Sequence, residues 1–326
     1  FINAIQLIVM MVLLLIGIMV SRATIVAPVY NDSPIGSPPM MPFIFIIIAC
    51  GAISGFHSLV SSGTSSKQIS KEKDALFIGY GGMLLEGVLS ILVIIAVSAG
   101  IGMGIKGGDG SLLTGIDAWN SRYISWQAVS GLSAKIGAFV LGSSNLMSSI
   151  GIPTFLSVTI MGVFLVSFAS TTLDSAVRLQ RYVITELADT FGIKFIAKRY
   201  QATSLAVLSA LLLIFMQPGG KGALILWPLF GSVNQLLAAL ALTVSTVYLK
   251  KINRPYYVTA IPMVFMLLMT GWAMLLNIEH FYIEEKWFLF VVGSLLFILE
   301  LWMLIESFLI LINRKNRDFG LAELKV

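Results

Sequence analysis

The feature that most constrains this chain is the recurrence of apolar stretches long enough to cross a lipid bilayer, which takes about 20 helical residues. Hydrophobic residues make up 57% of the sequence and charged residues 11%, and the mean hydropathy is +0.93. A soluble domain does not have this composition. The sequence therefore predicts an all-α polytopic membrane protein. Its expected spans, about eight in number, lie near residues 4–20, 41–65, 74–101, 153–187, 202–217, 223–249, 256–275 and 286–312.

The loops between these stretches indicate how the chain is oriented. Lysine and arginine gather in alternate connections, at residues 67–73, 194–199, 250–254 and 314–325, while the intervening connections carry fewer over longer lengths. Cytoplasmic loops are the ones that carry the excess of positive charge. We therefore expect these four segments, and with them the C-terminus, to be cytoplasmic.

The domain organisation follows from the same pattern. We interpret residues 1–326 as a single transmembrane domain whose residues 313–326 form a cytoplasmic tail. Residues 102–152 open with glycines and continue as a moderately apolar stretch, too weak to span and too apolar for a free loop. We expect short helices there, covering the extracellular or periplasmic mouth. The alternative, one more transmembrane helix, would invert every later loop against the charge bias.

Several function classes find no support in the sequence. The net charge of +5 comes from short loops between spans, so it does not indicate nucleic-acid binding. The single cysteine, Cys50, excludes an internal disulfide. Metal-ligand spacings, phosphate-binding loops and nucleophile motifs do not occur. We expect no enzymatic activity, cofactor or metal. Because the chain begins at Phe1 without a signal-peptide pattern, we interpret it as a portion of a longer protein.

The second apolar stretch is interrupted in its middle. Gly51, Ser54 and Gly55 follow a continuous apolar run, and His57 comes next. Glycine costs about 1 kcal/mol relative to alanine in a helix, and a histidine at membrane depth is expensive. Transporters place substrate at such unwound segments, where freed backbone groups can bind it. The alternative is an unbroken helix that packs closely through Gly51 and Gly55.

A second stretch, LILWPLFGSVNQLLAAL, also has the marks of a break. Pro228 removes a backbone hydrogen bond and Gly231 loosens the next turn. Asn234 places an amide in apolar surroundings, as does the glutamine after it, and Trp227 either lines the same cavity or anchors at the interface. We therefore expect this stretch to contribute Trp227 and Asn234 to a substrate cavity.

Ionisable residues inside the spans are few and by default face the bundle interior. Glu86 follows several glycines, and Asp174 lies near the cytoplasmic half of a long helix. Arg178 is four residues beyond Asp174, so an internal ion pair is the alternative to a coupling role. Glu300 and Glu306 lie in the strongly apolar last span, and we expect them to serve packing or an oligomer contact.

Hydroxyl groups precede Asp174 by about one helical turn. Ser170, Thr171 and Thr172 supply oxygen atoms of the kind that sodium takes as ligands, while the nearby carboxylate is able to carry a proton. The alternative is that these hydroxyls bond back to their own helix. The choice between proton and sodium remains open at this point.

The chain resembles the carbon starvation protein family, CstA, over about residues 40 to 250, in the stretches GAISGFHSLVSSGTSSKQI, IGYGGMLLEG, FASTTLDSAVRLQRY and LWPLFGSVNQLLAALAL. The resemblance implies a proton-coupled uptake protein of the bacterial inner membrane for pyruvate or, by older naming, peptides. It also implies the inverted-repeat fold of the LeuT type. The spans before the fifth core helix, including the first broken helix, would be missing N-terminal helices of the same protein. A chain without that first broken helix is expected not to transport.

We therefore expect a proton-coupled secondary transporter that imports a small carboxylate such as pyruvate during carbon starvation. Its alternatives are a peptide uptake transporter and a non-transporting membrane nutrient sensor. Its partners are the small-molecule substrate, a proton or a sodium ion, and the lipid bilayer. The residues expected to bind substrate are Gly51, Ser54, Gly55, His57, Trp227 and Asn234. The residues expected to take part in coupling are Glu86, Ser170, Thr171, Thr172 and Asp174.

Overall fold

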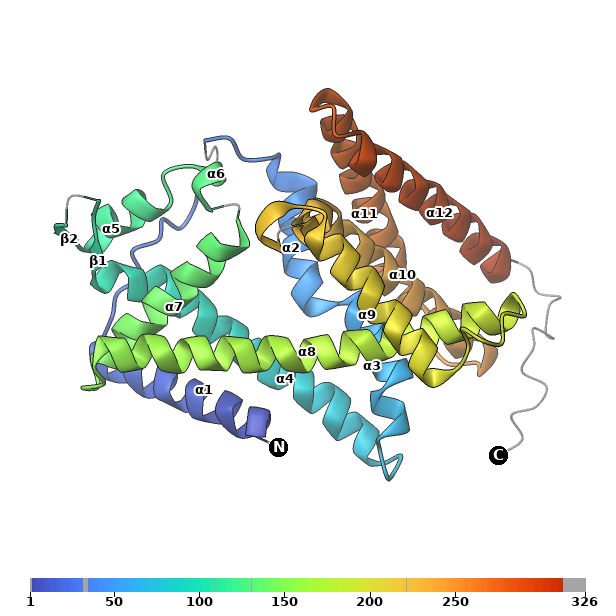
Figure 1. Cartoon of the computed structure of the whole chain (residues 1–326), viewed down its shortest axis with the longest axis horizontal. Coiled ribbons are helices and arrows are strands. Elements are labelled where there is room, and N and C mark those ends of the chain that lie inside the picture. The colour runs from blue at the N-terminus through green and yellow to red at the C-terminus, as the bar shows by residue number, and fades with distance from the viewer. Residues whose placement is uncertain (1, 32–34, 109, 130, 221, 313–326) are drawn as a thin grey trace. The chain divides into compact units, whose positions relative to one another are not determined.

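The computed structural model describes residues 2–31, 35–108, 110–129, 131–220 and 222–312, and this part of the chain is mostly helical (Figure 1). The predicted cytoplasmic tail, residues 313–326, lies outside the described residues. The chain divides into two compact units. One contains residues 1–38 and 69–176, and the other contains residues 39–68 and 177–326.

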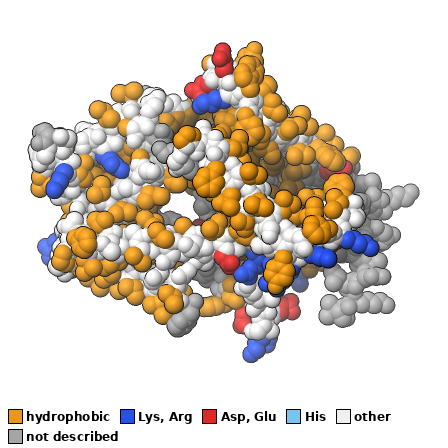
Figure 2. Space-filling view, in the orientation of Figure 1, with side chains coloured by type: hydrophobic (Ala, Val, Ile, Leu, Met, Phe, Trp, Pro, Cys, Tyr) orange, Lys and Arg blue, Asp and Glu red, His pale blue; other side chains and the backbone are white. Residues whose placement is uncertain are grey.

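Seven helical segments among the described residues are long and apolar enough to cross a membrane, so the chain is a multi-pass membrane protein. They are Ile2–Ser21, Met40–Lys67, Asp74–Met103, Thr154–Thr190, Gly222–Lys251, Tyr257–Ile283 and Trp287–Glu306. The fifth predicted span, residues 202–217, corresponds to Arg199–Phe215, a shorter apolar helix of 17 residues. Apolar side chains cover much of the surface seen in Figure 2, as lipid-facing helices require.

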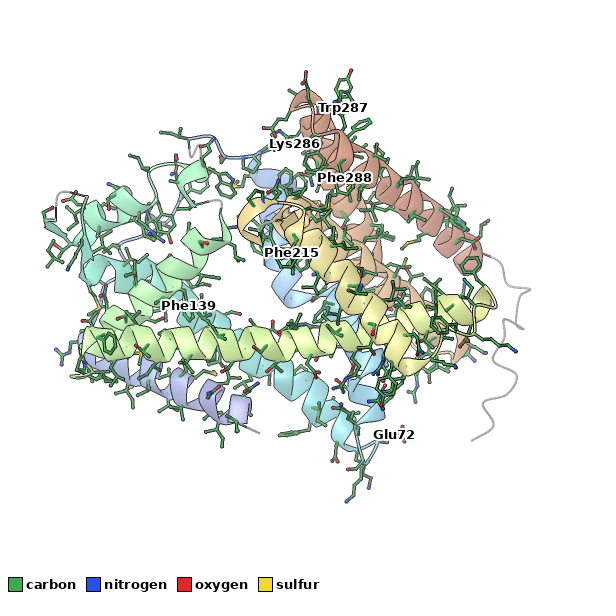
Figure 3. All side chains as sticks on the ribbon, in the orientation of Figure 1. Glu72, Phe139, Phe215, Lys286, Trp287 and Phe288 are labelled. Carbon is green, nitrogen blue, oxygen red and sulfur yellow. The ribbon has the colours of Figure 1, made fainter. Side chains whose placement is uncertain are left out.

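The first unit packs its helices around a methionine- and leucine-rich core. Met10 and Leu14 meet Leu92, Leu146 and Met161 there, all almost fully buried. Phe139, labelled in Figure 3, belongs to the same cluster. The elements of this unit are α1 (Ile2–Ser21), α4 (Asp74–Ile95), the π-helical turn η2 (Ala96–Gly100), η3 (Ile101–Met103), β1 (Ile105–Lys106), β2 (Leu112–Leu113), α5 (Gly115–Arg122), α6 (Trp126–Val129), α7 (Leu132–Ser148) and the first part of α8 (Thr154–Thr190).

Residues 102–152 contain helices α5, α6 and α7, as expected, and also two short strands that the sequence did not predict. The two short strands pair antiparallel, with Ile105 opposite Leu113. Helix α7 packs so closely on η2 that a Cβ on Gly142 would lie 1.9 Å from the Ala96 carbonyl oxygen. The Asn145 amide donates to the carbonyl oxygens of Gly100 and Gly104 at 2.8 Å each. Close glycine packing and side-chain amides thus hold this segment against the end of α4.

The second unit contains two apolar clusters and a set of antiparallel helices. One cluster is centred on Ala238, Met266 and Leu267, and the other on Leu229 and Met274. The elements of this unit are α2 (Met40–Ala52), α3 (Gly55–Gly63), η1 (Ser65–Lys67), the last part of α8, α9 (Arg199–Phe215), η4 (Pro218–Gly220), η5 (Gly222–Leu226), α10 (Trp227–Lys251), α11 (Tyr257–Ile283) and α12 (Trp287–Ile312).

Helix α10 is continuous, so the prediction of a second broken stretch is wrong. Pro228 lies in the first turn of α10, just after the 3₁₀ turn η5. Backbone N–H groups in a first turn have no intrahelical partner, and a proline there removes no hydrogen bond. Gly231 lies inside the helix, where its small size lets Ile46 of α2 approach. Both residues therefore serve the start and packing of one helix.

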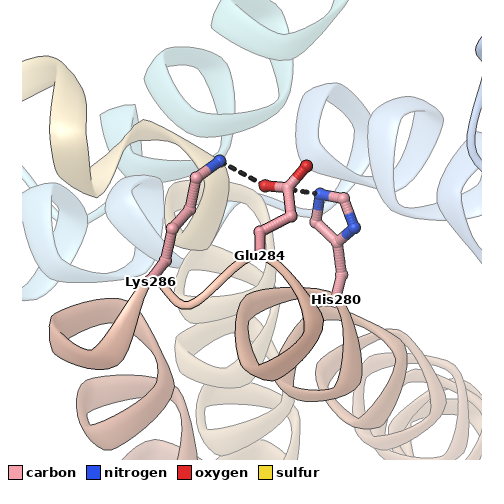
Figure 4. Close-up of polar contacts among 3 residues, drawn as sticks. All are labelled: His280, Glu284 and Lys286. Carbon is pink, nitrogen blue, oxygen red and sulfur yellow. Dashed lines mark ion pairs between the residues drawn. The ribbon is translucent and has the colours of Figure 1, made fainter.

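The turn between α11 and α12 carries a small charged cluster (Figure 4). A carboxylate oxygen of Glu284 lies 3.2 Å from His280 Nε2 and 2.5 Å from Lys286 Nζ. The hydrogen bond from Lys286 holds the pKa of Glu284 below its usual value. Lys286, Trp287 and Phe288 lie together where α12 begins (Figure 3). Because the cluster is largely exposed, it orders this turn with only a small gain in stability.

Candidate functional site

The interruption predicted in the second apolar stretch is confirmed. Helix α2 ends at Ala52 and α3 begins at Gly55. Between them Ile53 (φ −136°, ψ 85°) and Ser54 (φ −92°, ψ 127°) have extended backbone. Such a break frees carbonyls at the end of one half-helix and N–H groups at the start of the next. In a membrane these groups must find partners inside the protein.

The side chain of Asn234, on α10, supplies partners for the start of α3. Its Oδ1 accepts hydrogen bonds from the backbone N–H of Phe56 at 2.8 Å and from the Ser54 hydroxyl at 3.2 Å. Its Nδ2 lies 3.1 Å from the sulfur of Cys50. An asparagine oxygen on a first-turn N–H is the chemistry of a helix N-cap. Here the cap comes from a different helix, about 180 residues along the chain.

The next residue, Gln235, serves the other side of the break. In the amide orientation that gives both side-chain groups a hydrogen bond, the nitrogen donates to the Ile53 carbonyl oxygen at 3.2 Å. The amide oxygen then accepts from the Cys50 N–H at 2.7 Å. Asn234 and Gln235 are both buried, with 4% and 0% of their surface exposed. We call these two amides with Cys50, Ile53 and Phe56 the break clamp. The clamp makes the unwound backbone a stable part of the fold.

The two glycines of the broken stretch have different surroundings. A Cβ on Gly55 would lie 2.2 Å from the Asn234 carbonyl oxygen and 2.3 Å from the Leu237 Cβ. Gly55 therefore lets α3 begin directly against the backbone of α10. At Gly51 the corresponding position has no atom within 4 Å. The break is thus tightly packed on one side and has open space beside Gly51.

The structure brings together some of the residues expected to bind substrate. Ser54 and Asn234 are hydrogen-bonded at the break, and Gly55 touches the backbone of Asn234. His57 is exposed on the first turn of α3. Trp227 is 42% exposed and stacks on Phe230, with ring centroids 5.4 Å apart. It precedes Asn234 by seven residues, about 10 Å along a helix.

The residues expected to take part in coupling belong to the first unit. Glu86 is half-buried on α4, and Asp174 is exposed on α8. The hydroxyls of Ser170, Thr171 and Thr172 donate to carbonyls four residues earlier, at 2.8, 3.1 and 3.3 Å. Their hydrogens are used within the helix, which is the local bonding that the sequence left open. Their oxygen lone pairs are what a cation would need.

Thr171 also accepts a hydrogen bond from the side-chain amide of Asn3, on α1. Sequence reasoning missed this contact, and it also missed the parts that Gln235 and Cys50 play in the break clamp. The available signal for the clamp was two adjacent amides in an otherwise apolar helix. Within the described ranges, no three His, Cys, Asp or Glu residues lie close enough together to hold a metal ion.

Comparison with known proteins identifies the family of the chain. Residues 1–106 and 116–273 match the family described as carbon starvation protein CstA. A protein named pyruvate/proton symporter BtsT, from Escherichia coli (strain K12), is 32% identical over 300 residues, which cover 75% of this chain and 42% of that protein. A peptide transporter CstA from Helicobacter pylori (strain J99) is 30% identical over 307 residues, covering 81% of this chain and 44% of the relative.

A peptide transporter CstA from Escherichia coli (strain K12) is 29% identical over 309 residues, which cover 79% of this chain and 44% of that protein. The chain thus spans less than half the length of these relatives. No solved structure matches it. The family match covers most of the chain, including the broken stretch and the clamp residues of α10. The chain belongs to the carbon starvation protein CstA family.

Proposed function

We propose that the protein to which this chain belongs is a proton-coupled secondary transporter that imports a small carboxylate such as pyruvate. The observation that carries the proposal is the break clamp: an interrupted helix, held open by dedicated amides, in a multi-pass membrane protein. Broken helices at membrane depth are where transporters bind substrate and ion. A relative named as a pyruvate/proton symporter supports the choice of substrate and of coupling ion.

Substrate would bind beside the break, on the side where Gly51 leaves open space. The start of a half-helix favours an anion, because its N–H groups and dipole present positive charge. Asn234 already uses the N–H of Phe56, so it positions the half-helix while His57 and the neighbouring first-turn groups face the anion. Ser54, Gly55 and Trp227 complete the proposed substrate set.

The wider architecture is part of the same proposal. The chain would be the later part of a LeuT-like inverted-repeat bundle in the bacterial inner membrane, with its C-terminus in the cytoplasm. In that fold α1 corresponds to the fifth core helix, α2 and α3 to the sixth, α4 to the seventh and α8 to the eighth. Residues 102–152 would cover the outer mouth. Coupling would use Asp174 or Glu86, with the hydroxyls of residues 170–172 nearby.

Uptake into liposomes tests the transport proposal. The protein is reconstituted, a pH gradient is imposed with its acidic side outside, and entry of labelled pyruvate is followed while sodium is varied independently. We expect saturable accumulation that collapses when a protonophore removes the gradient and does not depend on sodium. Equal uptake with and without the gradient would contradict proton coupling. Uptake that depends on a sodium gradient instead would identify sodium as the coupling ion.

Peptide uptake is the second candidate, because several relatives are named peptide transporters. The two candidates are separated by competition in the same liposomes. If pyruvate is the substrate, excess unlabelled pyruvate blocks uptake of the label and a mixture of dipeptides and tripeptides does not. Accumulation of a labelled dipeptide, with no pyruvate uptake, would favour the peptide alternative.

A further inference from the structure

A carboxyl group is buried in the middle of a membrane helix of the second unit. Glu300 lies thirteen residues after the start of α12 and twelve before its end. At 1.5 Å per residue, each end of the helix is about 18–20 Å away, so Glu300 lies near the middle of α12. Its side chain is fully buried, with 0% of the residue exposed. The sequence had suggested only packing or an oligomer contact for this residue.

The surroundings of Glu300 are apolar. Its carboxyl lies over Gly271 of α11, where a Cβ would be 3.4 Å from Oε1 and 3.8 Å from the Phe297 ring. One turn along α11 on either side of Gly271 are the buried residues Leu267 and Met274. The glycine therefore leaves room for the carboxyl between two apolar layers, and any larger residue would press on it.

Neither carboxyl oxygen of Glu300 has a hydrogen-bond partner among the described residues. The helices packed against α12 are α10 and α11. Their ionisable side chains lie toward the helix ends, with Glu279 about 12 Å from Gly271 along the axis. These side chains are Tyr248, Lys250 and Lys251 in α10, and Tyr257, Glu279, His280 and Tyr282 in α11.

Nothing in these surroundings stabilises an ionised carboxylate. An isolated charge at membrane depth is very costly, and such a group takes up a proton instead. The adjacent residue on α11, Thr270, is also fully buried with a hydroxyl that has no partner among the described residues. Two unsatisfied polar groups on neighbouring helices are not what a purely structural apolar interface requires.

We propose that Glu300 is a proton-binding site in the membrane interior, occupied by a proton in the conformation described here. When movement of α12 relative to α11 opens this interface to water, the carboxyl O–H bond breaks, water accepts the proton and a carboxylate remains. The inference of a bound proton rests on the burial of the Glu300 carboxyl and on its missing hydrogen-bond partners among the described residues. Its use in coupling, beside or in place of Asp174 and Glu86, rests on the proposed transport function.

Infrared spectroscopy of the reconstituted protein tests the bound proton directly. At neutral pH the wild type is expected to show the C=O stretch of a protonated carboxylic acid, shifted in D₂O. Glu300→Gln removes that band and keeps the wild-type melting temperature, because glutamine has the shape of the neutral acid. Glu306→Gln, at an exposed position on the same helix, keeps the band.

A second variant covers the case in which Glu300→Gln does not fold. Glu300→Asp retains an acid and should move the band rather than abolish it. The proposal is overturned if the wild type lacks the band at neutral pH. It is also overturned if the band is unchanged in both Glu300 variants.

Transport then tests the use of the proton. In Glu300→Gln we expect pyruvate counterflow to persist while pH-gradient-driven accumulation falls at least about tenfold, with Glu306→Gln like the wild type. Gradient-driven accumulation at the wild-type level in Glu300→Gln would overturn the coupling role. If the wild type itself shows no gradient-driven uptake, the transport proposal fails, and the infrared result still decides whether Glu300 binds a proton.

Discussion

Replacing Asn234 by leucine removes half of the break clamp at nearly constant volume. The Phe56 N–H loses its acceptor, and an unpaired buried donor costs about 1–3 kcal/mol. The contacts with Ser54 and Cys50 are interhelical side-chain bonds, which average about 0.6 kcal/mol each in a membrane. Leucine recovers part of this by burying apolar surface. We expect a net cost of about 2 kcal/mol, concentrated at the break.

Cys50 makes this loss measurable at the site itself, because it is the only cysteine of the chain and belongs to the clamp. If modification requires opening of the break, about 2 kcal/mol corresponds to a rate increase of roughly 30-fold. Cys50 is half-buried, so this is an upper value. The assay is the rate of maleimide modification of the Cys50 peptide, followed by mass spectrometry.

Asn277→Leu provides the matched control. Asn277 is also a buried amide of the second unit, and it donates to Ser232 at 3.3 Å without touching the break. The Asn277→Leu substitution should lower the melting temperature and leave the rate of Cys50 modification close to that of the wild type. Equal labelling rates in Asn234→Leu and wild type, or an equal increase in Asn277→Leu, would refute the account of the clamp.

Three further predictions follow from single positions. Gly55→Ala forces a Cβ into the backbone of α10 and should destabilise by about 1–3 kcal/mol, whereas Gly51→Ala meets no atom and should be neutral or stabilising, as thermal unfolding will show. Because the pKa of Glu284 is lowered in the fold, its ionised form stabilises the protein at pH values above the ordinary glutamate pKa, and this stability is lost as the pH falls through the lowered pKa. Glu284→Gln should flatten that acid dependence, by at most about 1 kcal/mol because the pair with Lys286 is exposed. Asp174→Asn is expected to keep pyruvate counterflow and lose pH-gradient-driven accumulation; accumulation equal to wild type, in protein matched for melting temperature, would move the coupling role elsewhere.

The membrane class and the position of the break could be predicted because both depend on local sequence. Apolar length alone indicates a span. Gly51, Ser54 and Gly55 weaken helix formation wherever they lie, and the chain indeed leaves helical geometry at Ile53 and Ser54. Residues 102–152 were likewise predicted as short helices, because their composition suits neither a span nor a free loop.

Contacts between distant residues could not be predicted in the same way. The pairing of Asn234 with Phe56 joins positions about 180 residues apart, and nothing local specifies it. Pro228 was expected to break a helix, but its effect depends on whether it occupies the first turn, which only the structure decides. Glu300 gives no signal in sequence beyond its charge, since its burial over Gly271 arises from the packing of α11 against α12.

The central claim is that substrate binds at the clamped break, and protection of Cys50 tests it most directly. Cys50 lies one residue before Gly51, and its sulfur contacts Asn234. In reconstituted protein that accumulates pyruvate, we predict that saturating pyruvate slows maleimide modification of Cys50 in a dose-dependent way, at concentrations that also saturate uptake. Lactamide, a neutral molecule of similar size, should give no protection. Modification of Cys50 at an unchanged rate under saturating pyruvate would contradict binding at the break.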